Sequence, residues 1–144
     1  MIEQDTIRLL RECDAGVKMG IASLDGVLDS VQSDALKRTL STCRDEHDKL
    51  EREIREHLDR FGDEGKNPNP MARGMAAMKT DVELAMDRSD ARVADLITDG
   101  CNMGVKSLSK YLNQYAAADE FTKDIAKRLI ALEDTLARDI RGFL

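Results

Sequence analysis

A six-residue pattern occurs twice in this chain, at a shift of 88 between Cys13 and Cys101. Cys13-Asp-Ala-Gly-Val-Lys recurs as Cys101-Asn-Met-Gly-Val-Lys, which places Gly16 and Gly104 at equivalent positions. Each copy lies midway along a stretch in which apolar residues are three and four apart, and a second such stretch follows it. Repetition of a unit of this size predicts two related helical hairpins within one chain.

The first hairpin is predicted over residues 4–61, with helices at about 4–30 and 34–60. Ser33 is a suitable N-cap for the second helix, and Gly62 is a suitable residue just beyond its end. The apolar positions that should face the core of this hairpin are Leu10, Cys13, Val17, Ile21, Leu24 and Leu28, followed by Leu36, Leu40, Cys43, His47, Leu50, Ile54, His57 or Leu58, and Phe61.

The second hairpin is predicted over residues 89–144, with Ser89 capping a helix to about residue 116 and a last helix to about residue 143. Both prolines lie in the intervening segment 62–88, which we expect to cross the molecule and to contain a shorter helix at 71–86 that Pro70 begins. The core positions of the second hairpin are Val93, Ile97, Cys101, Val105, Leu108, Leu112 and Tyr115, followed by Ile125, Leu129, Leu132, Leu136 and Ile140 or Phe143.

The second helices of the two hairpins also correspond, at a shift of 89. Leu36 then falls on Ile125, Leu40 on Leu129, and other core positions on core positions. Two hairpins joined by a connection of this length predict an all-α fold, a four-helix bundle with one long crossover, as a single domain over residues 1–144.

Composition limits the possible partners. Positive and negative residues are interleaved, the net charge is −6, and no basic patch is visible, which argues against nucleic-acid binding. No apolar run approaches the roughly 20 residues of a membrane span, and no targeting segment is recognisable at the N-terminus. Three widely spaced cysteines do not form a disulfide framework. The expectation is a cytoplasmic protein with reduced thiols.

Several short segments also resemble a known group of proteins. The chain resembles the ferritin-like superfamily along nearly its whole length, and is most similar to small bacterial ferritin-like domains of unknown function. The segments that carry this resemblance are Gly20-Ile-Ala-Ser-Leu-Asp-Gly-Val-Leu-Asp, Ala35-Leu-Lys, Leu58-Asp-Arg-Phe-Gly-Asp, Ile97-Thr-Asp-Gly-Cys-Asn, Lys106 and Tyr111-Leu. They are mostly packing positions, so the resemblance implies a fold rather than an activity.

Ferritin-like oxidases carry a di-iron or di-manganese site, which needs a Glu from each of two helices and Glu-x-x-His from each of the other two. This chain departs from that pattern. Its two histidines, His47 and His57, both fall on the second helix, and the last helix has Glu133-Asp-Thr-Leu136 without a histidine. We therefore expect a degenerate metal site and no di-iron cofactor.

Four donors remain on core faces and are the candidate metal ligands: Cys13, Cys43, His47 and Cys101. If they meet at one level of the bundle, their sulfur and nitrogen atoms suit zinc or copper. The alternative, which the absence of any Cys-x-x-Cys spacing favours, is that the cysteines are small buried apolar residues and that the histidine bonds to a neighbouring helix. Thiol redox chemistry would require an accessible cysteine of low pKa.

The paired glycines Gly16 and Gly104 are costly within helices, by roughly 1 kcal/mol each relative to alanine. They indicate either close helix packing or a small internal pocket. The methionines of the crossover either pack it onto the bundle or form an adaptable surface for a partner; they are Met71, Met75, Met78 and Met86.

No catalytic set of residues is recognisable: there is no phosphate-binding glycine loop and no Ser–His–Asp combination. The sequence thus favours a non-enzymatic structural or interaction protein that forms a homodimer or binds a protein partner. The alternative is a protein that binds a metal or small ligand at the Cys/His cluster in its core.

Overall fold

The computed structural model describes residues 2–144, except the side chains of residues 71–73 and 75. Over these residues the chain is helical and contains no strand, which confirms the prediction of an all-α protein. No helix in this part of the chain is both long and apolar enough to cross a membrane. The helices are α1 (Ile2–Leu28), α2 (Asp34–Arg60), α3 (Pro70–Met86), α4 (Asp90–Gln114) and α5 (Glu120–Asp139), followed by a 3₁₀ turn at Arg141–Phe143.

Local capping groups set most of the helix ends. The Ser33 hydroxyl accepts a hydrogen bond from the backbone N–H of Leu36, and Ser89 does the same for Arg92, as predicted. Asp119 caps α5 through the N–H of Thr122. Gly62 follows α2 with φ of 65°, the left-handed conformation that ends a helix most easily when no Cβ is present. The last helix is shorter than predicted because its final turn tightens into the 3₁₀ turn.

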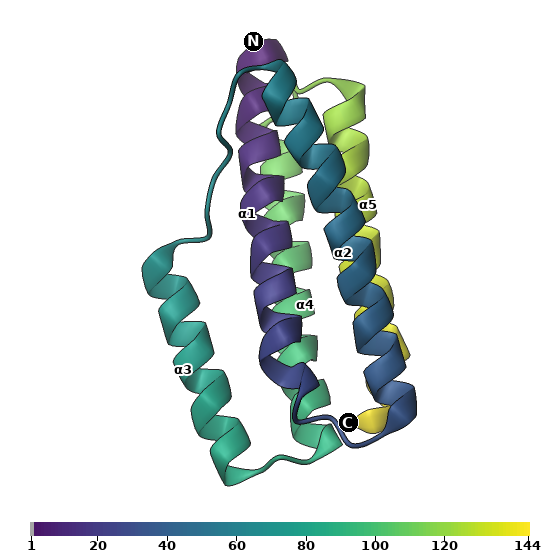
Figure 1. Ribbon diagram of the computed structural model, residues 1–144. Helices are drawn as coiled ribbons and strands as arrows, with labels where there is room; N and C mark the ends of the chain where they lie inside the picture. The colour runs from purple at the N-terminus through teal and green to yellow at the C-terminus, as the bar shows by residue number, and fades with distance from the viewer. Residues whose placement is uncertain (1) are drawn as a thin grey trace.

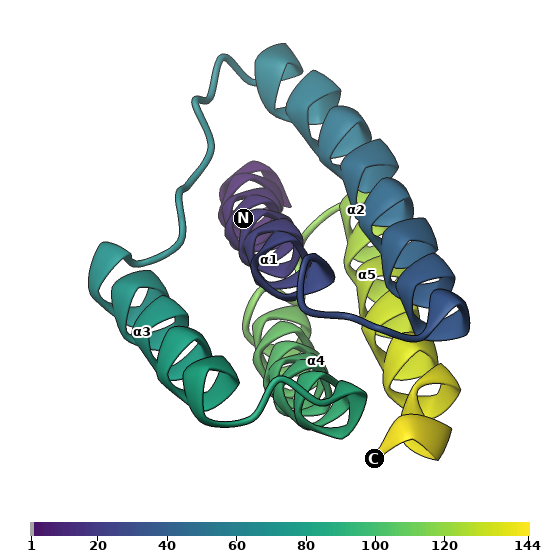
Figure 2. The same ribbon diagram turned by 60° about the horizontal axis from the view of Figure 1, so that its bottom comes forward.

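Four long helices lie alongside one another, and α3 stands apart from them (Figure 1). α1 runs antiparallel to both α2 and α4, and α5 runs antiparallel to α4 (Figure 1). The segment after α2 descends along the outside of the molecule, forms α3, and returns the chain to the end where α4 begins. Seen from below, α3 faces the side on which α1 and α4 are neighbours, opposite α2 and α5 (Figure 2).

Buried apolar side chains form two clusters along the long helices. One contains Leu36, Cys43, Val93 and Cys101, and the other contains Leu10, Cys13, Ile54 and Leu129. Most of the predicted core positions are buried, including every predicted position of α2 from Leu36 to Leu58. Helical periodicity in the sequence therefore identified the packed faces correctly.

The connection between α2 and α3 is fixed to α1 by a buried carboxylate. Asp14, fully buried, accepts hydrogen bonds from the Lys66 backbone N–H and the Lys18 ammonium, each at 2.9 Å. Gly65 crosses directly over it with φ of 84°, and a Cβ at this position would collide with the Asp14 carboxylate. Burial, followed by hydrogen bonding to Asp14, raises the pKa of the neighbouring Glu51 to about 7.

Among the described side chains of α3, those near its C-terminal end hold it against the bundle. Leu84 is the buried residue among the described side chains of this helix, and Glu83 forms an ion pair with Arg92 of α4 at 3.5 Å. Met78 and Met86 are 68% and 85% exposed, so these two do not pack the helix onto its neighbours as one alternative had it. Met71 and Met75 lie outside the described side chains. Between α3 and the pair α1–α4 a space remains.

Candidate functional site

A buried charge pair joins α2 to α5 in the middle of the molecule. The Nε2–H of His47 donates to Oε1 of Glu133 at 2.8 Å, and the Nδ1–H of His47 donates to the backbone carbonyl of Cys43, also at 2.8 Å. The His47 side chain is 1% exposed and that of Glu133 is 11% exposed. The two residues lie 86 apart in the sequence, so this pair ties the two halves of the chain together.

The hydrogen bonds of His47 determine its charge. Burial alone lowers the pKa of this imidazole, but hydrogen bonds to the Cys43 side chain, the Glu133 carboxylate and the Cys43 carbonyl outweigh it and raise the pKa to about 10. Both ring nitrogens face acceptors, as they must in an imidazolium ion. At neutral pH the pair is therefore an imidazolium–carboxylate pair with no net charge.

Two glycines make room for this pair. A Cβ on Gly20 of α1 would lie 2.7 Å from Nε2 of His47, and a Cβ on Gly104 of α4 would lie 3.3 Å from Oε2 of Glu133. Side chains at these positions would thus press on the imidazole and on the carboxylate. The absence of both side chains leaves the charge pair accessible from the side of the molecule on which α3 stands.

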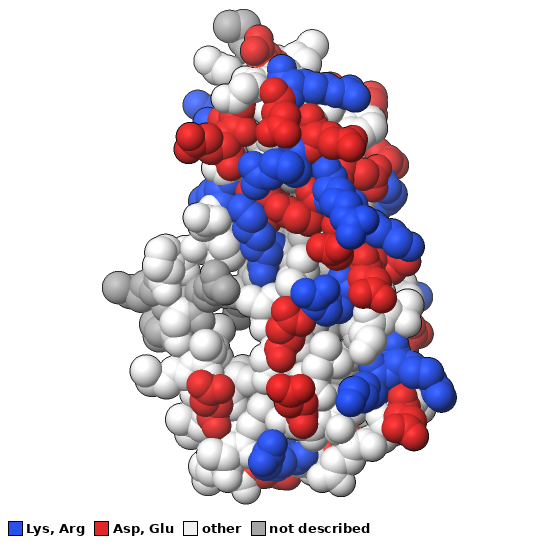
Figure 3. All heavy atoms as spheres, in the orientation of Figure 1, with Lys and Arg blue, Asp and Glu red and all other residues white. Residues whose placement is uncertain are grey.

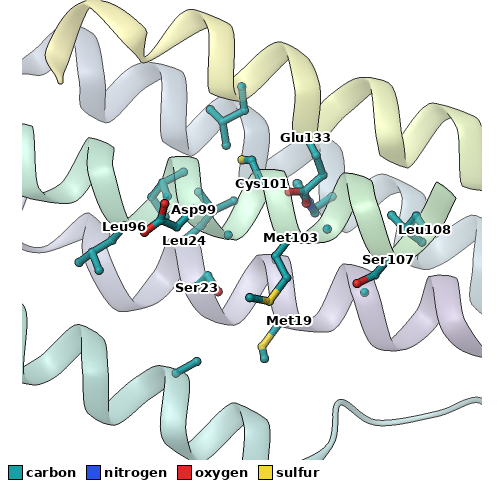
Figure 4. Close-up of a pocket in the computed structure, with 18 of the residues that line it drawn as sticks. Met19, Ser23, Leu24, Leu96, Asp99, Cys101, Met103, Ser107, Leu108 and Glu133 are labelled. Atoms are coloured by element: carbon teal, nitrogen blue, oxygen red, sulfur yellow. The ribbon is translucent and has the colours of Figure 1, made fainter. Parts of the chain in front are cut away.

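A cavity of about 430 Å³ occupies that side, between α1, α4 and α3. The molecule is visibly hollowed between α3 and α1, and charged side chains of both signs gather over α1 and α2 in this view (Figure 3). The wall is mostly apolar, with Leu24, Leu96, Met19 and Met103 among its residues, and the charge pair forms part of it. Met19 and Met103 reach into the space from opposite helices, and Glu133 approaches from behind α4 (Figure 4).

A second repeat, which overlaps the first, supplies much of the cavity wall. Gly16-x-x-Met19-Gly20-x-x-Ser23-Leu24 recurs as Gly100-x-x-Met103-Gly104-x-x-Ser107-Leu108, at a shift of 84, one helical turn short of the cysteine-centred repeat. All ten named residues line the cavity. Because these positions are three and four apart, each copy forms a single face of its helix. The two antiparallel helices therefore present matching faces to the same space.

The predicted cysteines and histidine do not all meet. Cys43 and Cys101 lie in one core cluster close to His47 and Glu133, whereas Cys13 lies in the other cluster. The three cysteines are free and buried. Burial, with neighbouring carboxylates adding to it, raises the pKa of Cys13 to about 12 and also raises that of Cys101. These two side chains are thus neutral thiols at physiological pH and weak nucleophiles.

Sequence reasoning placed Gly16 and Gly104 either at close helix packing or at a small pocket, and both line the cavity, as do Gly20 and Gly100. It overlooked Glu133 as a core residue because no apolar stripe marks a buried carboxylate. The repeat at a shift of 84 was the available signal for the cavity. Among the described residues, no three His, Cys, Asp or Glu side chains form a group able to hold a metal ion.

Comparisons with protein-family models, with curated proteins and with solved structures find no match to this chain.

Proposed function

We propose that this chain is a non-enzymatic protein that binds a small molecule in the cavity between α1, α3 and α4. The observation that carries the proposal is the doubled motif, since all ten of its residues line one cavity. A cavity of this volume is typical of sites for small organic ligands. Four glycines in the wall are costly to helix stability, by roughly 1 kcal/mol each, and a requirement for open space explains their use.

An organic ligand suits the site better than a metal ion. Both ring nitrogens of His47 donate hydrogen bonds, which leaves no lone pair for coordination. Cys101 is held as a neutral thiol, while metal ligands are thiolates. Zinc or copper at this place would require His47 and Cys101 to lose their protons together. The alternative function predicted from the sequence is the binding of a metal or of a small ligand, and the cavity supports the small ligand.

The ferritin-like assignment belongs to the same proposal. Two helical hairpins joined by a long crossover are the connectivity expected of that superfamily, and α2, α3 and α4 follow one another in this order. On this interpretation the buried His47–Glu133 pair, which joins α2 to α5, lies in the bundle core, where related oxidases hold two metal ions.

Filling the cavity should weaken ligand binding without harming the fold. We expect the apolar dye N-phenylnaphthylamine to bind the wild-type protein with a rise in fluorescence. Gly100→Ala adds a methyl group to the wall, where no atom lies within 4 Å of the new Cβ. This variant should be more stable by up to about 1 kcal/mol yet bind the dye roughly tenfold more weakly, because the methyl group takes up ligand space.

Gly26→Ala is the matched control. Gly26 also lies in a helix with no atom near the added Cβ, but it does not line the cavity. Its substitution should leave dye affinity unchanged, as titration by fluorescence would show. Absence of dye binding to the wild type, or equal binding by Gly100→Ala, would contradict the proposed function.

Self-association is a second candidate function, favoured by a separate observation on α3. Met78, Val82 and Met86 are spaced four apart and are 68%, 54% and 85% exposed, forming an apolar row on its outer side. We expect light scattering to show a dimer at tens of micromolar and the double variant Val82→Lys, Met86→Lys to be monomeric. Asn113→Lys, at an exposed position of α4, should remain dimeric. A monomeric wild type would exclude this candidate.

A further inference from the structure

The position of Glu133 in the cavity wall constrains the chemistry of the ligand. Oε1 of this carboxylate accepts from His47, while Oε2 lies next to the backbone of Gly104, at 3.3 Å from where a Cβ would stand. A carboxylate has about four lone-pair positions, of which His47 uses one and the Cys101 thiol another. Glu133 therefore offers further acceptor capacity toward the space that Gly104 leaves open (Figure 4).

The neutrality of the charge pair restricts the ligand in a second way. Three other charged side chains line the cavity: Glu12 and Lys79 are paired with Lys66 and Glu83, and Asp99 is exposed. The imidazolium of His47 already balances Glu133, so a charged group placed beside this pair would have no counter-charge there, which is costly. An uncharged ligand with an N–H or O–H group avoids that cost and donates to an ionised acceptor, the stronger type of hydrogen bond.

The donor group should lie near the middle of the ligand. The cavity follows α1 from Glu12 to Val27, about 22 Å at the helical rise. Gly20, which faces the charge pair, lies close to the midpoint of that length. Apolar wall extends in both directions from it, through Leu24 and Leu96 on one side and Leu108 on the other (Figure 4).

We propose that the ligand is an uncharged molecule with apolar groups on both sides of a central N–H or O–H donor, and that this donor bonds to Glu133. The inference rests on the proposed function. The apolar arms lie along the matching faces of α1 and α4, where the methionine side chains adapt to their shape, and the central donor fixes their position.

Three compounds of equal size test the inference. Diphenylamine has a central N–H, diphenyl ether has the same shape without a donor, and hydroxybiphenyl has its donor at one end. We expect diphenylamine to displace N-phenylnaphthylamine from the wild-type protein at a concentration about tenfold lower than either other compound. Calorimetry would verify the affinities directly.

Two alanine variants of α4 separate the role of Glu133 from cavity size. Gly104→Ala covers the carboxylate, so it should abolish the preference for diphenylamine over diphenyl ether. Gly100→Ala narrows the cavity one helical turn away from Glu133. It should weaken the binding of both compounds while preserving the ratio of their affinities. Should Gly104→Ala fail to fold, the double variant His47→Leu, Glu133→Leu serves instead: it removes the acceptor together with its buried partner, so the ratio should fall.

The outcomes are distinguishable. Equal affinities for diphenylamine and diphenyl ether in the wild type would overturn the central-donor inference and leave ligand binding intact. Tighter binding of hydroxybiphenyl would overturn the central position of the donor. If none of the compounds and no dye binds, the proposed function fails, and the inference fails with it.

Discussion

Replacing Glu133 by alanine is expected to lower the free energy of unfolding by about 3 to 5 kcal/mol at pH 7, the usual cost of removing one partner from a buried ion pair. The substitution leaves the His47 imidazolium, which is 1% exposed, without its carboxylate. A loss of this size is a large fraction of the stability of an ordinary domain. Thermal and denaturant unfolding monitored by circular dichroism would measure it.

A second substitution should recover part of the loss. The double variant His47→Leu, Glu133→Leu removes both charges together, and apolar replacement of a whole buried pair is often close to neutral. Glu56→Ala is the control at an exposed carboxylate and should change stability by no more than about 0.5 kcal/mol. A double variant less stable than the sum of the two single variants predicts would contradict the pairing.

The same pair gives the stability a pH dependence. The pKa of His47 is raised from 6.5 to about 10, so its contribution is complete below pH 6.5 and is lost as the pH rises through about 10. Wild-type stability should therefore fall between pH 7 and pH 9. This window avoids two other titrations, since the pKa of Glu51 is about 7 and the ordinary pKa of cysteine is 9.0. The Glu133→Ala variant should show a much smaller slope over this range.

Two glycine-to-alanine substitutions in α1 should have opposite effects. Gly26→Ala meets no atom within 4 Å and should raise stability by up to about 1 kcal/mol through helix propensity alone. Gly20→Ala would place its Cβ 2.7 Å from Nε2 of His47, a ring held by hydrogen bonds at both nitrogens. The imidazole cannot move without losing one of them, so we expect a net loss of about 2 kcal/mol or more.

Denaturant titration of the two variants beside the wild type would measure the difference, expected to be about 3 kcal/mol. The variant His47→Leu provides a further comparison. In its background Gly20→Ala should be less destabilising, because the leucine side chain can rotate where the hydrogen-bonded imidazole cannot. If Gly20→Ala and Gly26→Ala are equally stable, the close approach of α1 to His47 does not constrain the helix.

Features determined by neighbouring residues could be predicted from the sequence. The Ser33 and Ser89 caps, the end of α2 at Gly62 and the buried face of α2 all depend on groups within a few positions of one another. Features determined by distant residues could not. The burial of Glu133 depends on His47, and the burial of Asp14 depends on the backbone of Lys66 and the charge of Lys18.

The cavity falls between these cases. Its glycines were visible in the sequence, and the pairing of Gly16 with Gly104 suggested either close packing or a pocket. Only the relative position of α1, α3 and α4 shows that Gly16, Gly20, Gly100 and Gly104 line the same space. The connection that leads to α3 is fixed to α1 through the Lys66 backbone and Asp14, a contact that no periodicity in the sequence reports.

The two halves of the chain differ in sequence, and this difference has a consequence for the buried charge pair. At the shift that aligns α2 with α5, His47 corresponds to Leu136 and Glu133 to Arg44, so neither half of the chain contains both members. In a symmetric dimer of one hairpin, residue i of one copy meets residue j of the other and the reverse, so a buried pair of this kind would occur twice. A single chain can place the pair once: at the corresponding positions Leu136 is apolar and Arg44 pairs with Asp25 at the surface. The desolvation cost of one buried charge pair, instead of two, therefore falls on this fold.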